Sequence, residues 1–496
     1  MDTELKFEQI PYYDLLTKVV TTHEETTETT LPDYCATASR ILETAGQLLV
    51  REKQAAEGIL RGEVRVTVLY LSEETEGLQS VTVMVPFTCE LSDPKLRACQ
   101  MLQVHSRLLL CEAKPITGRK LYLRVIPELT VLGFGEKQLR FCCGAAGKGL
   151  QLRRESRQLR MLTAAEERSC GVTQEFDCGQ MQVEEILMSQ MAPQVTSCQQ
   201  IGSKLVVKGE IRLGAMLRLA DRKLYDLLQT LPFSQILDGF TPDAESAFHA
   251  EVQPAEWDLR LVRSDGGCRM GLTARLTLQV FACRTRQLSN ITDLYSTCLP
   301  LQAELETVGF TQRCSPVCAA EWAEETLESG GGALFAYVTA LDGGAVMARY
   351  ENGRTELSTT VRIQILYQDE SGTPVTAERS REIHASVDGS LDAVWVRCGV
   401  PELRGSAGTC QVRVPVYFCG ITGEKAELQT VTAVQEKPTE EDTVRPSLVL
   451  RRAGCGECLW DIAKQHGSSE EAIRRYNAME DDTLPDGMLL IPVLRT

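Results

Sequence analysis

The sequence predicts a mainly β protein, with three β-rich, sandwich-like repeat domains followed by a small βααβ module. Three observations lead to this fold class. Segments of similar sequence start at Gly62, Gly209 and Thr359, which are 147 and 150 residues apart. Each segment alternates its side chains with the period of two that a half-buried strand shows. The last part of the chain, 447–496, changes to the apolar spacing of amphipathic helices.

The length and composition favour several domains over a single core. The chain has 496 residues, which suggests about three domains. We place three β domains at 1–165, 166–300 and 301–434, a linker at 435–446 and the C-terminal module at 447–496. The net charge of −16 argues against a general binder of nucleic acid or anionic membranes, because affinity for phosphate comes from clustered Lys and Arg. No apolar run is long enough to predict a membrane span.

The three similar segments, GEVRVTVLY, GEIRLGAML and TTVRIQILY, are each predicted to form a strand with one apolar face. The residues on this face are Val64, Val66, Val68 and Tyr70 in the first segment, Ile211, Leu213, Ala215 and Leu217 in the second, and Val361, Ile363, Ile365 and Tyr367 in the third. A second strand ends at Pro86-Phe87 in the first copy and at Pro232-Phe233 in the second, and the third copy has Glu382-Ile383 there. A later apolar run closes each copy, which predicts mostly antiparallel β domains.

Other segments predict helices, a loop or a linker. Short helices are expected before the first strand of copies one and two, at 36–49 and 181–188. Residues 21–30 are polar and Thr-rich, which fits either a loop or an exposed strand. Residues 435–446 are charged and include two prolines, which is typical of a linker.

The C-terminal module is predicted to contain four short elements. A strand at 447–452 precedes a helix at 459–466, and a final strand occupies 488–491. Ser468 and Glu471 predict a capping box at the start of a second helix, which precedes the final strand. The residues expected on the inner faces of the two helices are Leu459, Ile462, Ala463, Ala472, Ile473 and Tyr476, with Asn477 closing the second helix.

This module resembles the LysM domain family. The residues that match its pattern are Gly456, Leu459, Trp460, Ile462, Ala463, Asn477, Leu484, Gly487, Leu489, Ile491 and Pro492. The resemblance implies a groove between the loop before the first helix and the loop after the second, where family members bind N-acetylglucosamine glycans such as peptidoglycan or chitin. The residues of this partner- or glycan-binding groove are Gly456, Glu457, Cys458, Leu459, Trp460, Asn477, Ala478 and Met479.

The first loop of the module departs from the family pattern. Glu457 and Cys458 stand where the family normally has Asp and Thr or Ser, so that a thiol, a poor hydrogen-bonding group, replaces a hydroxyl. Leu459, Trp460 and Met479 are the candidate apolar anchors for a protein partner, and Trp460 fits a core position equally well.

The β repeats resemble SPOCS-domain proteins. The matching residues of the first copy are Pro32, Asp33, Ile41, Leu42, Gly46, Gly62, Leu69, Tyr70, Pro86 and Phe87. The second copy keeps Val207, Lys208, Gly209, Pro232 and Phe233, and the third keeps Leu366 and Tyr367. SPOCS repeats followed by a LysM module are similar to the architecture of SipL-type spore morphogenesis proteins.

That resemblance implies a non-catalytic scaffold or adaptor in bacterial spore coat assembly, whose LysM module docks a SpoIVA-type coat ATPase. It also implies a location in the mother-cell cytoplasm, at the forespore surface and spore coat, and the N-terminal sequence agrees because it shows no signal peptide pattern. Self-association through exposed strand edges is a further expectation. The alternative is a LysM protein that binds peptidoglycan or a chitin-like glycan.

The 19 cysteines are expected to be mostly reduced, buried thiols. Cys455 and Cys458 form a Cys-x-x-Cys, for which packing, a redox or cross-linking pair and half of a metal site are the alternatives. A thiol-based coat cross-linker is therefore a third hypothesis. The sequence contains no nucleophile-elbow, phosphate-loop or metalloprotease motif, so no enzymatic activity, cofactor or metal is expected.

Overall fold

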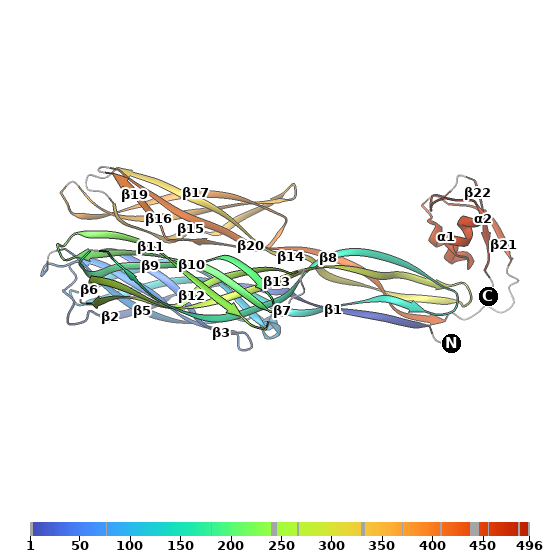
Figure 1. Ribbon diagram of the computed structural model, residues 1–496, viewed down its shortest axis with the longest axis horizontal. Helices are drawn as coiled ribbons and strands as arrows, with labels where there is room; N and C mark the ends of the chain where they lie inside the picture. The colour runs from blue at the N-terminus through green and yellow to red at the C-terminus, as the bar shows by residue number, and fades with distance from the viewer. Residues whose placement is uncertain are drawn as a thin grey trace.

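The structure, a computed structural model, is mainly β. It describes residues 3–75, 77–179, 181–239, 246–264, 267–328, 333–369, 371–406, 409–436, 446–454, 456–484 and 487–494. Strands hold 78% of the residues and helices 5%, in several antiparallel sheets, which confirms the mainly β class. The molecule is elongated, and the C-terminal module lies beyond the ends of the longest strands (Figure 1).

Three antiparallel sheets of three strands each have the similar segments at their centres. The first consists of β3 (Arg40–Gln54), β4 (Ile59–Leu71) and β5 (Leu78–Glu90). The second consists of β9 (Val183–Ile201), β10 (Lys204–Leu219) and β11 (Leu224–Leu237). The third consists of β15 (Ala333–Glu351), β16 (Arg354–Gln368) and β17 (Pro374–Asp388). The three segments therefore lie on the central strands β4, β10 and β16.

The longest strands pair two by two in an 11-stranded sheet. The pairs are β1 (Glu4–Thr22) with β7 (Lys120–Ala146), β8 (Leu150–Asp177) with β13 (Gly267–Ser296), and β14 (Leu301–Glu328) with β20 (Thr409–Glu436). The shorter strands beside them are β2 (Glu25–Thr30), β6 (Met101–Thr117), β12 (Ser246–Ser264), β18 (Leu391–Cys398) and β19 (Glu402–Ser406), and the 3-10 turn η1 (Pro94–Ala98) precedes β6. Neighbouring pairs are joined by single β-bridges. Tyr13 of β1 pairs with Leu162 of β8, and Arg313 of β14 pairs with Arg160 of β8.

Each three-stranded sheet packs on one long strand pair through its apolar face. Val64, Val66 and Val68 of β4 are fully buried and share a core with Leu123 and Val131 of β7. The corresponding residues of the other two cores are Ile211 of β10 with Leu276 of β13, and Ile363 of β16 with Val414 of β20. Burial of these apolar faces is the main force that holds each sheet on its strand pair.

The central strands are buried on both faces toward their ends, so the prediction of half-buried strands is wrong there. Leu69, Met216 and Leu366 occupy the same position in the three similar segments. All three are at most 1% exposed and belong to one cluster with Leu187 and Met188. The three sheets therefore meet around this cluster, which no single segment indicates.

A glycine lies opposite an aromatic ring in two of the three sheets. The facing residues are Gly62 with Phe87, Gly209 with Phe233, and Thr359 with Ile383. A Cβ atom on Gly209 would lie 2.3 Å from Cζ of Phe233, so the ring occupies the space that a side chain would need. The third sheet has a larger residue on β16 and an aliphatic one on β17. This pairing explains why the glycine and the Pro-Phe motif occur together in two copies and are lost together in the third.

Both predictions of a helix before the central strands are wrong. Residues 40–54 form β3 and residues 183–201 form β9, and each strand pairs along its length with the central strand of its sheet. The register shifts between Ile41 and Glu43 and again near Ile186, where one strand carries an extra residue. A β-bulge interrupts the period of two, and the resulting apolar spacing imitates that of a helix. In 21–30 the strand alternative agrees with the structure, because β2 pairs with β7.

The positions of the predicted domain boundaries stay predictions. Strand β8 runs continuously through residues 165 and 166, and β14 begins at Leu301. Strand β20 reaches Glu436, and residues 437–445 of the predicted linker lie outside the described residues.

The C-terminal module consists of β21 (Leu448–Arg452), α1 (Leu459–His466), α2 (Glu470–Tyr476) and β22 (Met488–Pro492). Strands β21 and β22 pair antiparallel. The cap of α2 is Ser469 and not Ser468, because the Ser469 hydroxyl accepts the amide N–H of Ala472 at 3.1 Å. Ser468 is instead fully buried in front of the helix. No helix in the described ranges is long and apolar enough to cross a membrane.

Candidate functional site

The loop before α1 holds three of the predicted groove residues, and its polar side chains are already engaged. Gly456 is exposed and has a φ of 85°, a backbone conformation that favours glycine. The Glu457 carboxylate accepts the amide N–H of Gly454 at 2.6 Å and forms an ion pair with Arg451. The hydrogen bond from Gly454, followed by the one from Arg451, lowers the pKa of Glu457.

Cys458 stands at the N-cap of α1. Its side chain makes no capping hydrogen bond to the helix backbone, and its thiol donates to Oδ2 of Asp461 at 2.9 Å. A Ser or Thr at this position would cap the helix. Cys455, the other half of the Cys-x-x-Cys, lies outside the described residues.

The loop after α2 holds Asn477, Ala478 and Met479. The amide of Asn477 donates to the carbonyls of Ile473 and Leu490 and accepts the N–H of Leu490 at 2.8 Å. Asn477 therefore ties the end of α2 to β22. Ala478 is exposed with a φ of 53°, and Met479 is half-buried against the module core.

Leu459 and Trp460 face inward. Leu459 is 2% exposed and packs in the core of the module. The indole N–H of Trp460 donates to Oδ2 of Asp293 on β13 at 2.8 Å, and the ring packs edge to face on Tyr295 with centroids 4.9 Å apart. Trp460 is thus a contact to the strand pair β8–β13 and not an anchor in the groove.

Three further contacts complete the junction between the module and β13. The Nζ atom of Lys464 lies 2.7 Å from both carboxylate oxygens of Asp293. The hydroxyl of Tyr295 donates to the carbonyl of Ser468 at 2.9 Å, which accounts for the burial of that segment. Burial raises the pKa of Tyr295, and the nearby Glu470 and Asp293 raise it further. No local sequence pattern indicates this junction, because Asp293 and Tyr295 are far from the module along the chain.

The outer face of the two-stranded β21–β22 sheet carries exposed apolar side chains. Leu448, Leu450 and Met488 are 47%, 57% and 56% exposed, which is high for residues of this kind. Leu450 lies opposite Leu490, which is half-buried. The module therefore presents two surfaces: the two loops with Gly456, Cys458, Ala478 and Met479, and this sheet face.

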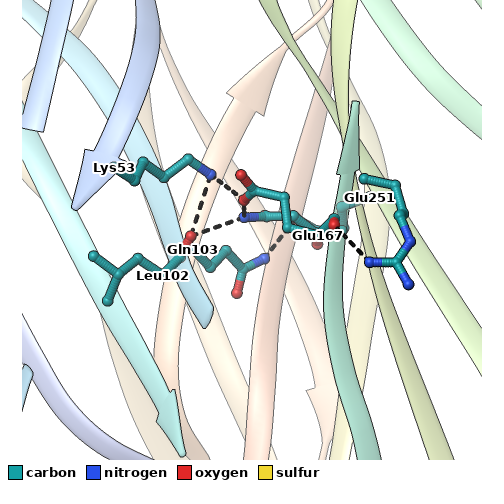
Figure 2. A network of polar contacts seen from close by, with 7 residues as sticks. Lys53, Leu102, Gln103, Glu167 and Glu251 are labelled. Atoms are coloured by element: carbon teal, nitrogen blue, oxygen red, sulfur yellow. Dashed lines mark hydrogen bonds and ion pairs between the residues drawn. The ribbon is translucent and has the colours of Figure 1, made fainter. Parts of the chain in front are cut away.

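A second region of interest lies among the strands β3, β6, β8, β12 and β13. The ammonium of Lys53 pairs with the Glu167 carboxylate and donates to the carbonyl of Leu102 (Figure 2). Gln279 donates to Glu167 at 2.9 Å and to Leu102 at 3.0 Å, and Gln103 donates to Glu251 at 2.9 Å. Burial lowers the pKa of Lys53, and the charge of Glu167 opposes that effect. A buried polar network therefore joins β3 and β6 to β8, β12 and β13.

Strand β18 also contacts this region. The ring of Trp395 stacks on His105 of β6 with centroids 3.8 Å apart. Burial lowers the pKa of His105 to about 3, which keeps the imidazole neutral. Burial also disfavours the charged form of Glu251, but the hydrogen bond from His249 and the charge of Arg397 outweigh it and lower the pKa of Glu251 to about 2.

A cavity of about 290 Å³ lies among β3, β6, β9, β12 and β18. Its polar lining includes His105, Arg107, Arg212 and Arg397. Arg107 pairs with Glu128 at 2.6 Å, Arg212 pairs with Glu402 at 2.8 Å, and Arg397 donates to the carbonyl of Val252 at 3.4 Å. Each guanidinium on the described part of the lining is thus already engaged by the protein.

Among the described residues, no group of three or more His, Cys, Asp or Glu side chains is placed to hold a metal ion. That part of the chain therefore supplies no cluster that would complete a metal site with the Cys-x-x-Cys. Comparison of the chain with models of known protein families, with curated proteins and with solved structures found no match.

Proposed function

We propose that this chain is a non-catalytic scaffold or adaptor of bacterial spore coat assembly, whose C-terminal module docks a SpoIVA-type coat ATPase at the forespore surface in the mother cell. The proposal rests on the resemblance to LysM and SPOCS-domain proteins. The observation that carries it furthest is the way the module is held. Trp460 and Lys464 bind Asp293 on one side, and the two loops with Gly456 and Ala478 remain exposed on the module surface.

The contacts within the loops favour a protein partner over a sugar. Sugar recognition needs free hydrogen-bonding groups that point at the ligand. The Glu457 carboxylate is engaged by Gly454 and Arg451, the Cys458 thiol by Asp461, and the Asn477 amide by Ile473 and Leu490. What remains outward is the backbone of the loops with the side chains of Ala478 and Met479, which suits an apolar protein contact.

The test is binding of the full-length chain to the purified coat ATPase, with single substitutions that leave the fold intact. Ala478→Arg places a long charged side chain on the exposed loop and should weaken binding at least about tenfold, or about 1.4 kcal/mol. Met488→Arg is the matched control, because Met488 is also exposed but lies on the sheet face. Affinity that is unchanged by Ala478→Arg, or retained after deletion of 447–496, contradicts docking through the loops.

Titration with chitin oligomers distinguishes this proposal from the alternative, a protein that binds peptidoglycan or chitin. Calorimetry of the full chain should show no micromolar binding if the module recognises protein. Micromolar binding that Ala478→Arg abolishes would favour the glycan interpretation instead.

A further inference from the structure

Two thiols face each other across the strands β14 and β20. Cys318 and Cys419 are register partners in this antiparallel pair. Their Sγ atoms are 2.8 Å apart, and both residues are free cysteines. They are 101 residues apart in the chain, so no sequence spacing indicates that they meet.

The strand pair already has the geometry that a disulfide needs. Directly opposite residues of antiparallel strands have Cα atoms about 4.5 or 5.5 Å apart, which lies within the range of about 4.4–6.8 Å found for disulfides. A bond between the two sulfur atoms therefore requires a small rotation of the side chains and no movement of the strands.

The two thiols differ in access and in charge environment. Cys318 is exposed, and Cys419 is 1% exposed. A guanidinium nitrogen of Arg397 lies 4.0 Å from Sγ of Cys419. The hydrogen bond between the two thiols, with the charge of Arg397 as a further cause, lowers the pKa of Cys318, and the same hydrogen bond and burial raise that of Cys419. A nearby cation favours the thiolate, which is the nucleophile in thiol–disulfide exchange.

We propose that Cys318 and Cys419 form a redox-active dithiol, which a small-molecule disulfide oxidises to an intramolecular disulfide. The Cys318 thiolate attacks one sulfur of the small disulfide, forms a mixed disulfide and releases one small thiol. The Cys419 thiolate then attacks Sγ of Cys318, which closes the protein disulfide and releases the second small thiol. Two electrons pass from the protein to the small disulfide, and the two protons of the cysteines leave on the two small thiols.

Burial disfavours the thiolate form at several other cysteines. Burial raises the pKa of Cys111 and Cys398 to about 12 and that of Cys283 to about 11. Cys178 and Cys268 also lie side by side at the ends of β8 and β13, but burial and the neighbouring thiol raise the pKa of Cys178 to about 11. These thiols are expected to react more slowly, because the thiolate fraction is smaller.

The disulfide would form at the junction of the three repeats. Cys419 has Cys318 on one side in the sheet and Trp395 of β18 on the other. Trp395 stacks on His105 of the first repeat, and Arg397 donates to Val252 of the second. Oxidation therefore joins β14 to β20 next to the strand that contacts both other repeats.

The experiment is oxidation of the reduced full-length protein with glutathione disulfide at pH 7.5, followed by alkylation of the remaining thiols and peptide mapping. We expect a cross-linked peptide containing Cys318 and Cys419 before other cysteines react. Cys419→Ser should stop at one glutathione on Cys318, and Cys318→Ser should slow modification of Cys419 at least about tenfold. Cys178→Ser is the matched control and should leave the cross-link unchanged.

Two results would overturn the proposal. The first is oxidation of other cysteines while Cys318 and Cys419 remain free thiols. The second is modification of Cys419 at the wild-type rate in Cys318→Ser, since this would show that Cys318 is not the attacking thiol. Circular dichroism of each variant establishes that the fold is retained, and a variant that unfolds is replaced by the corresponding Cys→Ala.

Discussion

The ring of Phe233 on β11 covers Gly209 on β10, its partner across the sheet. A Cβ atom on Gly209 would meet Cζ of Phe233 at 2.3 Å and the backbone oxygen of Gln194 on β9 at 2.4 Å. The backbone oxygen cannot turn aside, so an added methyl must displace a strand. The glycine is therefore required by the close approach of three strands and not by an unusual φ.

Gly209→Ala is expected to destabilise the sheet of β9, β10 and β11 by about 1–3 kcal/mol, the usual cost of overpacking. Hydrogen exchange of amides in 204–237 measures the effect locally. Gly171→Ala is the matched control, because nothing lies within 4 Å of the position of its Cβ atom on β8. Equal exchange rates in the two variants would contradict the argument.

Some of these features follow from the sequence and others do not. The alternation of apolar and polar residues predicts β4, β10 and β16. Their apolar faces are continuous, from Val64 to Tyr70 in β4 and at the corresponding positions of β10 and β16. The helix predicted at 36–49 is wrong because a bulge at Ile41 hides the period of a strand. Contacts such as those of Trp460 with Asp293 join residues 167 apart, and nothing in either local pattern specifies the other.

Asp293→Ala should loosen the C-terminal module from β13. The substitution leaves the buried indole N–H of Trp460 without its acceptor and removes the ion pair with Lys464. An unsatisfied buried donor costs about 1–3 kcal/mol, so the fraction of undocked module should rise. Limited proteolysis between β20 and β21, and a red shift of the tryptophan emission, report this change.

Lys464→Ala is the control for this prediction. It removes only the partly exposed ion pair, whose contribution is expected to be below about 1 kcal/mol. Proteolysis of Lys464→Ala as fast as that of Asp293→Ala would show that the ion pair, and not the indole hydrogen bond, holds the module.

His105→Phe should make the protein more resistant to acid. Within the described part of the chain neither ring nitrogen of His105 has a hydrogen-bond partner, and burial lowers its pKa to about 3. The unfolded chain takes up a proton near pH 6.5 and the folded chain does not, so this residue reduces stability as the pH falls from about 6.5 toward 3, by about 2 kcal/mol at pH 5. Phe keeps the stack on Trp395 and cannot be protonated. The melting temperature at pH 5 should rise relative to wild type and change little at pH 7.5, and an equal change at both pH values would exclude the titration of His105 as the cause.

Asp226→Asn should act in the opposite pH range. Asp226 lies on β11 opposite Met216, and burial raises the pKa of its carboxyl to about 7. The folded chain keeps the proton up to about pH 7, whereas the unfolded chain releases it near pH 3.9. The carboxyl therefore reduces stability as the pH rises from about 4 to about 7, and the full loss persists at higher pH, where the fold must hold a partly buried carboxylate. The neutral amide should raise stability by about 1–3 kcal/mol at pH 8 and by little at pH 4. A stabilisation by Asp226→Asn that is the same at pH 4 and pH 8 would mean that packing and not charge is responsible.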